Sequence, residues 1–205
     1  MRRLAASVAL ALVVVRPGSA GAEGAIEIQA RGGHLSLQGV RARSNDRPSV
    51  VRDAVLDGSG AFRGVGFRAL GWDRTFRGGF QQTYLWSDAV NFSSAPLPAR
   101  YTIETRSFWG TNLELFLGGQ GGTRNVVLYG EFRLALYLLQ TRVALRSEAG
   151  GFLGDTRYLS VRGDVGPRLG LKVSLTRSTY LDTAVQVSIL GPERFASALG
   201  LGVTY

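Results

Sequence analysis

Large and small side chains alternate along most of this 205-residue chain. The last eleven residues show this most clearly, because their even positions hold Ala, Gly and Thr, whereas the large odd-position residues are Phe195, Leu199, Leu201, Val203 and Tyr205. Successive side chains of a β-strand point to opposite faces, so a period of two indicates strands. After residue 22 no segment sustains a helical stripe. The alternation therefore predicts an all-β fold.

Eight segments carry this pattern, and they cover residues 25–43, 61–71, 77–92, 101–117, 126–138, 159–175, 181–189 and 195–205. The alternation drifts near Leu138-Leu139, which leaves ten strands as an alternative count. In the first segment the phase shifts at Gly32-Gly33, and a Gly pair at such a shift predicts a β-bulge.

The lengths of strands and connections favour a membrane barrel over a soluble sheet. Two strands run about 17 residues, against roughly 5–6 for a soluble strand. Connections 71–76, 118–125 and 176–180 are short, whereas 44–60, 91–99 and 146–157 are longer, as in barrels with short periplasmic turns and longer outer loops. In a membrane barrel the apolar face points outward and the polar face points inward. We therefore predict an eight-stranded antiparallel transmembrane β-barrel.

The N-terminus has the organisation of an export signal. Met1-Arg2-Arg3 is positively charged, Leu4–Val15 is mostly apolar, and Ala20-Gly21-Ala22 matches the small-residue cleavage pattern. We predict a signal peptide over residues 1–22 and a single barrel domain over residues 23–205. Cleavage would lower the formal net charge from +9 to +6, because Arg2, Arg3 and Arg16 are lost.

The C-terminal strand resembles the final strand of outer-membrane barrels, in which a terminal aromatic follows alternating apolar residues. Together with the export signal and the strand pattern, it makes residues 23–205 similar to the small OmpA- and OmpX-type barrels. The resemblance implies location in the bacterial outer membrane and recognition by the barrel-assembly machinery through Leu199, Leu201, Val203 and Tyr205. Phe195 and Tyr205 are ten residues apart, about 25 Å along a tilted strand, and are expected at the two membrane interfaces.

Charged residues at inward positions are the most informative candidate site. They comprise five acids and five bases, namely Glu104, Arg106, Glu114, Glu131, Arg133, Arg162, Asp164, Arg168, Lys172 and Asp182. Side chains fill the interior of an eight-stranded barrel, and buried charges need partners. We therefore expect an internal charge network. A narrow channel lined by arginine is the alternative.

Composition argues against an enzyme and against a cofactor or metal site. The chain has no Cys, which removes thiol chemistry and cysteine metal sites, and its one histidine is His34. Ser36 shares a strand face with His34, which gives a weak catalytic pairing. No phosphate-binding glycine motif is present. The expectation is a non-enzymatic barrel with structural or surface-interaction roles.

Membrane lipid is the expected partner, and lipopolysaccharide is a second. Arginine suits phosphate groups, and five arginines fall near the predicted outer rim: Arg41, Arg43, Arg47, Arg52 and Arg100. Nucleic acid is not expected for an exported chain without a basic cluster. A third functional class, a soluble lipocalin-like periplasmic carrier, would place its large apolar residues inside.

Overall fold

The computed structural model describes residues 23–41, 55–88, 90–95, 101–147 and 149–205. The predicted signal peptide lies outside these residues, as do Arg43, Arg47, Arg52, Arg100 and the side chain of Arg41. The strands are β1 (Glu23–Arg41), β2 (Val55–Trp72), β3 (Phe76–Ser87), β4 (Asn91–Ala95), β5 (Tyr101–Gly122), β6 (Val126–Ser147), β7 (Phe152–Ser174), β8 (Thr179–Val187) and β9 (Glu193–Thr204).

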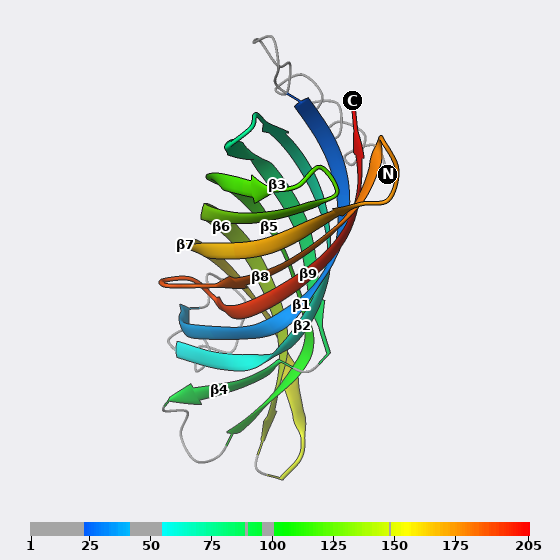
Figure 1. The fold of residues 1–205 in the computed structure, drawn as a ribbon. Helices are drawn as coiled ribbons and strands as arrows, with labels where there is room; N and C mark the ends of the chain where they lie inside the picture. The colour runs from blue at the N-terminus through cyan, green and yellow to red at the C-terminus, as the bar shows by residue number, and fades with distance from the viewer. Residues whose placement is uncertain (1–22, 42–54, 89, 96–100, 148) are drawn as a thin grey trace.

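Eight of these strands close into one antiparallel ring (Figure 1). Neighbours follow the order β1-β9-β8-β7-β6-β5-β3-β2, and pairing of β1 with β2 closes the ring. The ninth strand, β4, pairs with the first residues of β2 and continues the line of β3. The prediction of an eight-stranded antiparallel barrel is therefore confirmed. Within the described residues there is no helix of the length and apolar character that crossing a bilayer requires.

Large apolar side chains cover the outside of the ring, and polar side chains fill the inside. The outward positions at 113–117, 126–138 and 159–171 carry Leu, Val, Phe, Gly and Pro. The residues between them are mostly buried, and many are charged. This distribution is the reverse of a soluble barrel, and it argues against the lipocalin-like alternative.

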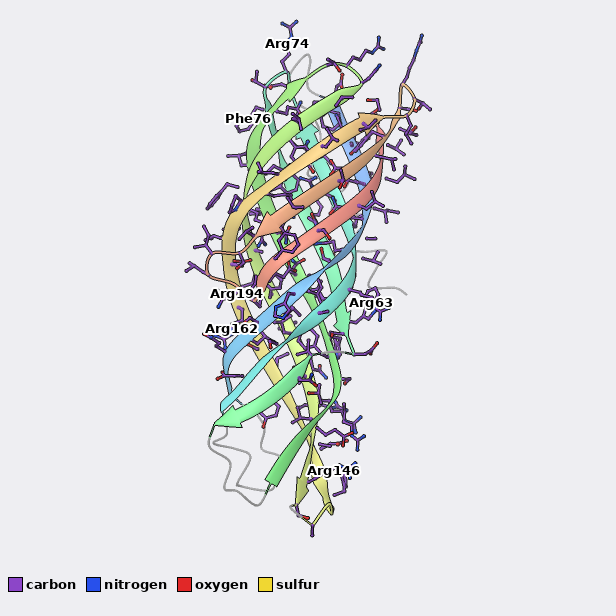
Figure 2. The ribbon with its side chains drawn as sticks, turned by 60° about the horizontal axis from the view of Figure 1, so that its bottom comes forward. Arg63, Arg74, Phe76, Arg146, Arg162 and Arg194 are labelled. Atoms are coloured by element: carbon purple, nitrogen blue, oxygen red, sulfur yellow. The ribbon has the colours of Figure 1, made fainter. Side chains whose placement is uncertain are left out.

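The two ends of the barrel differ. One end, which we call the terminal end, holds Glu23, the C-terminal Tyr205 and the turns after β2, β5 and β7. The opposite, or loop, end holds the β6–β7 hairpin, β4 and the β8–β9 turn. Strands β5, β6 and β7 are 22, 22 and 23 residues long, and they project past the other strands at the loop end (Figures 1 and 2).

The predicted β-bulge at Gly32-Gly33 is wrong. The β1–β2 register is continuous through Gly32 and Gly33, and it shifts only between Leu37 and Val40. Odd positions of β1 face inward throughout, from Glu27 to Leu37. The apparent phase shift arises because the interior itself changes from polar to apolar at this height, so the inward residues change type while the strand keeps its phase.

The predicted long loop over residues 146–157 is also wrong. β6 extends to Ser147 and β7 begins at Phe152, with Gly150 N donating to Ser147 O at 2.8 Å. Gly150 has positive φ in the turn itself, which suits a tight hairpin. Gly154 also has positive φ, and it lies on β7 where the β6–β7 register shifts. The Gly-rich composition of this segment therefore marks a turn inside an extended ribbon.

Candidate functional site

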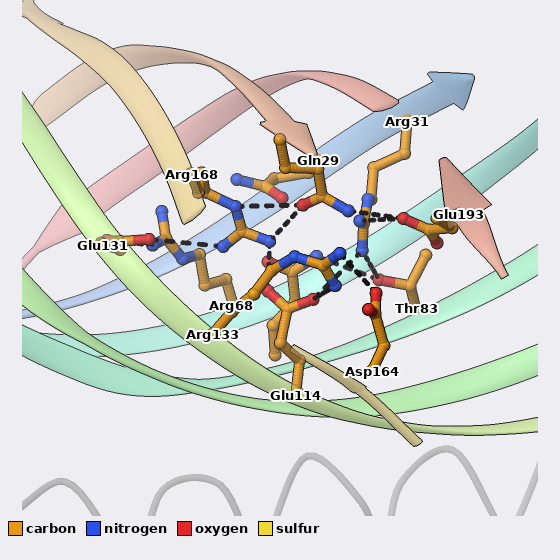
Figure 3. A network of polar contacts seen from close by, with 12 residues as sticks. Gln29, Arg31, Arg68, Thr83, Glu114, Glu131, Arg133, Asp164, Arg168 and Glu193 are labelled. Carbon is orange, nitrogen blue, oxygen red and sulfur yellow. Dashed lines mark hydrogen bonds and ion pairs between the residues drawn. The ribbon is translucent and has the colours of Figure 1, made fainter. Parts of the chain in front are cut away.

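The barrel interior contains a balanced set of buried charges. Among the described residues the buried acids and bases are six of each: Glu27, Glu114, Glu131, Asp164, Asp182 and Glu193, with Arg31, Arg68, Arg77, Arg133, Arg168 and Lys172. They come from β1, β2, β3, β5, β6, β7, β8 and β9, so every strand of the ring contributes. Figure 3 shows the part of the network around Glu114 and Glu131. Inward alternation places them there, since each strand contributes every second residue to the lumen.

Glu114 on β5 is the centre of the network. It forms ion pairs with Arg168, with Arg133 at 3.3 Å and with Arg31 at 3.9 Å. Arg31 also pairs with Glu193 at 2.9 Å, and it donates to Thr83 Oγ1 at 2.9 Å. One carboxylate thus connects three arginines from β1, β6 and β7.

Glu131 on β6 is a second centre towards the terminal end. It pairs with Arg68, with Arg77 Nε at 2.7 Å and with Arg168 at 3.4 Å. Two of these guanidinium groups also lie over aromatic rings, Arg68 over Phe116 at 4.0 Å and Arg77 over Tyr129 at 3.6 Å. Such cation–π contacts let a buried arginine satisfy a face that has no carboxylate.

Asp164 on β7 connects the network to the β8–β9 turn. One carboxylate oxygen pairs with Arg133 Nη2 at 2.5 Å, and the other accepts hydrogen bonds from Ser188 Oγ at 2.6 Å and Gly191 N at 2.8 Å. A Cβ on Gly191 would lie 2.1 Å from Asp164, so only glycine fits this close approach. The turn is therefore fixed by an interior charge.

The terminal end of the lumen is lined by aromatic rings and one ammonium group. Lys172 Nζ lies 4.0 Å from the centre of the Trp72 ring and 5.2 Å from that of Tyr180. Tyr180 donates to Glu27 at 3.2 Å, and Trp72 Nε1 donates to Glu23 at 3.1 Å. These contacts narrow the terminal mouth of the interior.

Beyond the charges, towards the loop end, the interior is filled by apolar side chains, which we call the apolar plug. Each member is at most 3% exposed, and they are Leu35, Leu37, Phe62, Leu85, Val90, Phe108, Ala135, Tyr137, Leu139, Val143, Tyr158 and Ala196. Arg133 donates to the Tyr137 hydroxyl at 3.2 Å, which joins the plug to the network. The lumen is thus occupied by paired charges and then by packed apolar groups.

Seven of the ten inward charges expected from the sequence lie in this interior: Glu114, Glu131, Arg133, Asp164, Arg168, Lys172 and Asp182. Glu104 and Arg106 do not. The β5–β6 register shifts between Thr105 and Ser107, which reverses the phase beyond the bulge. The two side chains are about 40% exposed and pair with each other at 2.9 Å. Arg162 is also outside the network, because β8 ends before reaching its level on β7, and it donates to Gln38 O instead.

Five interior charges were not expected: Glu27, Arg31, Arg68, Arg77 and Glu193. Glu27 and Arg31 alternate with the apolar Ile26, Ile28 and Ala30, so the rule that apolar positions face outward would have placed them inside. Arg68 alternates with outward Val65 and Phe67 and carried the same signal. Glu193 stood in a predicted loop, and the sequence alone gives no sign that β9 begins there.

Small residues on β9 make room for neighbouring side chains. A Cβ on Gly200 would lie 2.3 Å from Glu27 Oε1, and one on Gly202 would lie 2.1 Å from the Tyr180 ring. The predicted assembly-signal residues Leu199, Leu201, Val203 and Tyr205 face outward, and so does Phe195. His34 and Ser36 also share the outward face of β1. No group of three or more His, Asp or Glu side chains that could hold a metal ion occurs among the described residues.

No family model and no curated protein matches this chain. Among solved structures, Neisserial surface protein A superposes with a TM-score of 0.53 at 14% identity, over 90% of this chain and 98% of that one. Ail of Yersinia pestis gives 0.47 at 10% identity, over 91% and 100%. The N-terminal β-barrel domain of Pseudomonas aeruginosa OprF gives 0.42 at 12% identity, over 88% and 97%. The first likeness shows that the chain has the fold of a small outer-membrane β-barrel.

Proposed function

We propose that this chain is an integral outer-membrane barrel with a closed lumen, and that it is neither a channel nor an enzyme. The observation that carries the proposal is the order of layers inside the barrel. Paired charges fill its middle, and the apolar plug follows them towards the loop end. A conducting pore needs a continuous polar path, and the packed plug interrupts any such path.

The outer surface supports membrane insertion. Trp86 on β3 pairs directly with Trp109 on β5, and both rings face outward near the loop end. Phe76 and Tyr205 face outward at the terminal end. Two aromatic girdles flanking a Leu- and Val-rich band are the expected surface of a membrane barrel. In this orientation the terminal end faces the periplasm and the loop end faces outward.

The projecting sheet of β5, β6 and β7 is the surface we propose for interactions. It carries exposed ion pairs between Arg142 and Asp155 and between Arg146 and Glu104, the latter at 2.8 Å. A mixed-charge sheet held clear of the barrel suits a polar macromolecular partner. Presentation of this sheet is the role that a closed barrel can serve.

Conductance of the refolded chain in planar bilayers tests the proposal. We expect heat-modifiable mobility on gels, which demonstrates a folded barrel, together with bilayers that show no single-channel steps. A triple variant, Phe62→Ala, Phe108→Ala and Tyr137→Ala, removes bulk from the plug and serves as the opened control. Regular steps from the wild-type chain that change in size with Arg168→Ala would show a channel. Recovery of a soluble monomer would contradict the membrane assignment.

A further inference from the structure

The barrel wall has a notch at the loop end between β7 and β1. β7 pairs with β8 only from Arg168 onward, although β7 itself begins at Phe152. β1 pairs with β9 only as far as Leu35, although β1 continues to Arg41. The β8–β9 turn, residues 188–192, folds into the notch. Ile189 N donates to Val165 O at 2.9 Å, and Ser36 N donates to Pro192 O at 2.7 Å. The turn thus joins β7 to β1 where the wall lacks two strands.

A cleft of about 130 Å³ remains above this turn, and two arginines line it. Arg162 reaches it from β7, and Arg194 reaches it from the start of β9; Figure 2 shows both on the same side of the barrel. Arg162 donates to Gln38 O through Nη2 and to Ser160 Oγ through Nε at 3.1 Å, which leaves its Nη1 group for a ligand. Arg194 forms no ion pair or side-chain hydrogen bond with the described residues.

Two buried acids beside the cleft are already neutralised. Asp164 pairs with Arg133, and Glu193 pairs with Arg31, and both carboxylates are buried. Arg162 and Arg194 both line the cleft, and neither forms an ion pair with a described residue. Guanidinium groups are the cations that proteins favour for phosphate. Arg194 can donate two parallel hydrogen bonds, and Arg162 can donate through Nη1.

Apolar side chains flank the same cleft on the outside. Leu190 at the tip of the turn is 77% exposed, Ile189 is 57% exposed and Phe195 is 49% exposed. Phe195 is an outward aromatic at the loop end of β9, directly paired with Val187. The cleft therefore lies where the apolar band of the barrel ends, which is the level of lipid headgroups.

We propose that Arg162 and Arg194 form a binding site for the phosphate group of a membrane lipid in the leaflet at the loop end, with the acyl chains against Leu190 and Phe195. The proposal rests on the membrane insertion proposed above. The guanidinium groups supply the charge, Gln38 holds Arg162 in place through its carbonyl, and the fixed turn holds the two sides together.

Native mass spectrometry of the refolded chain in neutral detergent tests the site. The probe is dioctanoyl phosphatidic acid, and dioctanoylglycerol, which has the same chains and no phosphate, is the ligand control. We expect phosphatidic acid to be retained in preference to dioctanoylglycerol. The double variant Arg162→Gln and Arg194→Gln should weaken its binding by about tenfold or more. Matched controls are Arg74→Gln at the terminal end and Arg142→Gln on the projecting sheet, which should bind as the parent does.

Equal binding by the double variant and the parent would overturn the site. Inorganic phosphate separates a lipid from a free anion: displacement of phosphatidic acid by an equal concentration of inorganic phosphate would overturn the lipid assignment, and retention supports it. Failure of the underlying membrane assignment is visible separately, because the chain would then not insert into bilayers at all. Heat-modifiable mobility of the double variant verifies that it still folds.

Discussion

Glu114 on β5 and Arg168 on β7 form an ion pair across the lumen, although β6 separates their strands in the wall. The same carboxylate reaches Arg133 on β6 and Arg31 on β1. A single buried acid therefore faces three buried bases, and its removal leaves positive charges close together on side chains that are at most 1% exposed. An unpartnered buried charge is far more costly than an exposed one.

Glu114→Gln should lower the free energy of unfolding by about 3–5 kcal/mol, the usual cost of breaking a buried ion pair from one side. Urea titration of the refolded barrel, followed by the loss of the fast-migrating gel band, measures it. Glu104→Gln is the matched control, because Glu104 likewise forms ion pairs with arginines, two in its case, but its side chain is about 40% exposed. Its effect should stay within about 1 kcal/mol. Equal effects of the two substitutions would show that the interior is not dry.

Ser188→Ala should loosen the β8–β9 turn while leaving the ion pairs intact. Ser188 Oγ donates to Asp164 and accepts from Gly191 N at 2.8 Å, so the variant removes two of the bonds that hold the turn. Arg194 follows the turn and is exposed, which makes it a trypsin site. We expect faster trypsin cleavage after Arg194 at an unchanged global unfolding midpoint. Cleavage at the parental rate would mean that the backbone bonds of Ile189 and Ser36 suffice.

The sequence predicted the barrel because alternation is a local property of each strand. Outward Leu199, Leu201 and Val203 and inward Glu114, Arg133 and Arg168 follow from parity alone. Parity fails where an extra residue enters one strand, as at Arg106, whose bulge turns Glu104 out of the lumen. Parity also fails where a neighbouring strand ends, as at Arg162. The sequence of β7 carries no sign that β8 ends before it reaches the level of Arg162.

The interior layers show a different limit. Hydrophobic alternation assumes one chemical character for each face, whereas the inward face of β1 passes from Glu27 and Arg31 to Leu35 and Leu37. In the sequence alone, that change resembles the phase shift of a bulge. In the folded barrel Leu35 lies in the same buried cluster as Phe108 and Tyr158. Only this contact shows that the barrel interior changes from polar to apolar while the alternation of β1 keeps its phase.

Gly202→Ala should destabilise the barrel by about 1–3 kcal/mol, the usual cost of overpacking. The added Cβ would lie 2.1 Å from Cζ of Tyr180, whose ring is held edge-on against Trp72. Gly163→Ala is the control, since nothing lies within 4 Å of a Cβ there. Adding Tyr180→Leu should remove most of the cost of Gly202→Ala in a double-mutant cycle. If the effects of Gly202→Ala and Tyr180→Leu on stability simply add, the cost of Gly202→Ala does not come from contact with Tyr180.

The stability contributed by the β2–β3 turn should depend on pH through Asp73. Its carboxylate accepts hydrogen bonds from Phe76 N at 2.7 Å and Thr75 N at 2.8 Å. These backbone donors lower the pKa of Asp73 below its ordinary value. Because the folded-state pKa is the lower one, the contribution is complete above the unfolded pKa of about 3.9 and is lost as the pH falls through the folded value.

Asp73→Ala should therefore unfold at a lower urea concentration than the parent at pH 7. The difference between the two unfolding midpoints should narrow as the pH falls below about 3.9. Unfolding midpoints of the two chains between pH 7 and pH 2 measure this. Arg74→Gln changes the same exposed turn without removing the carboxylate, and its difference from the parent should stay flat. A gap between Asp73→Ala and the parent that is constant down to pH 2 would mean that the turn depends on the shape of the side chain and not on its charge.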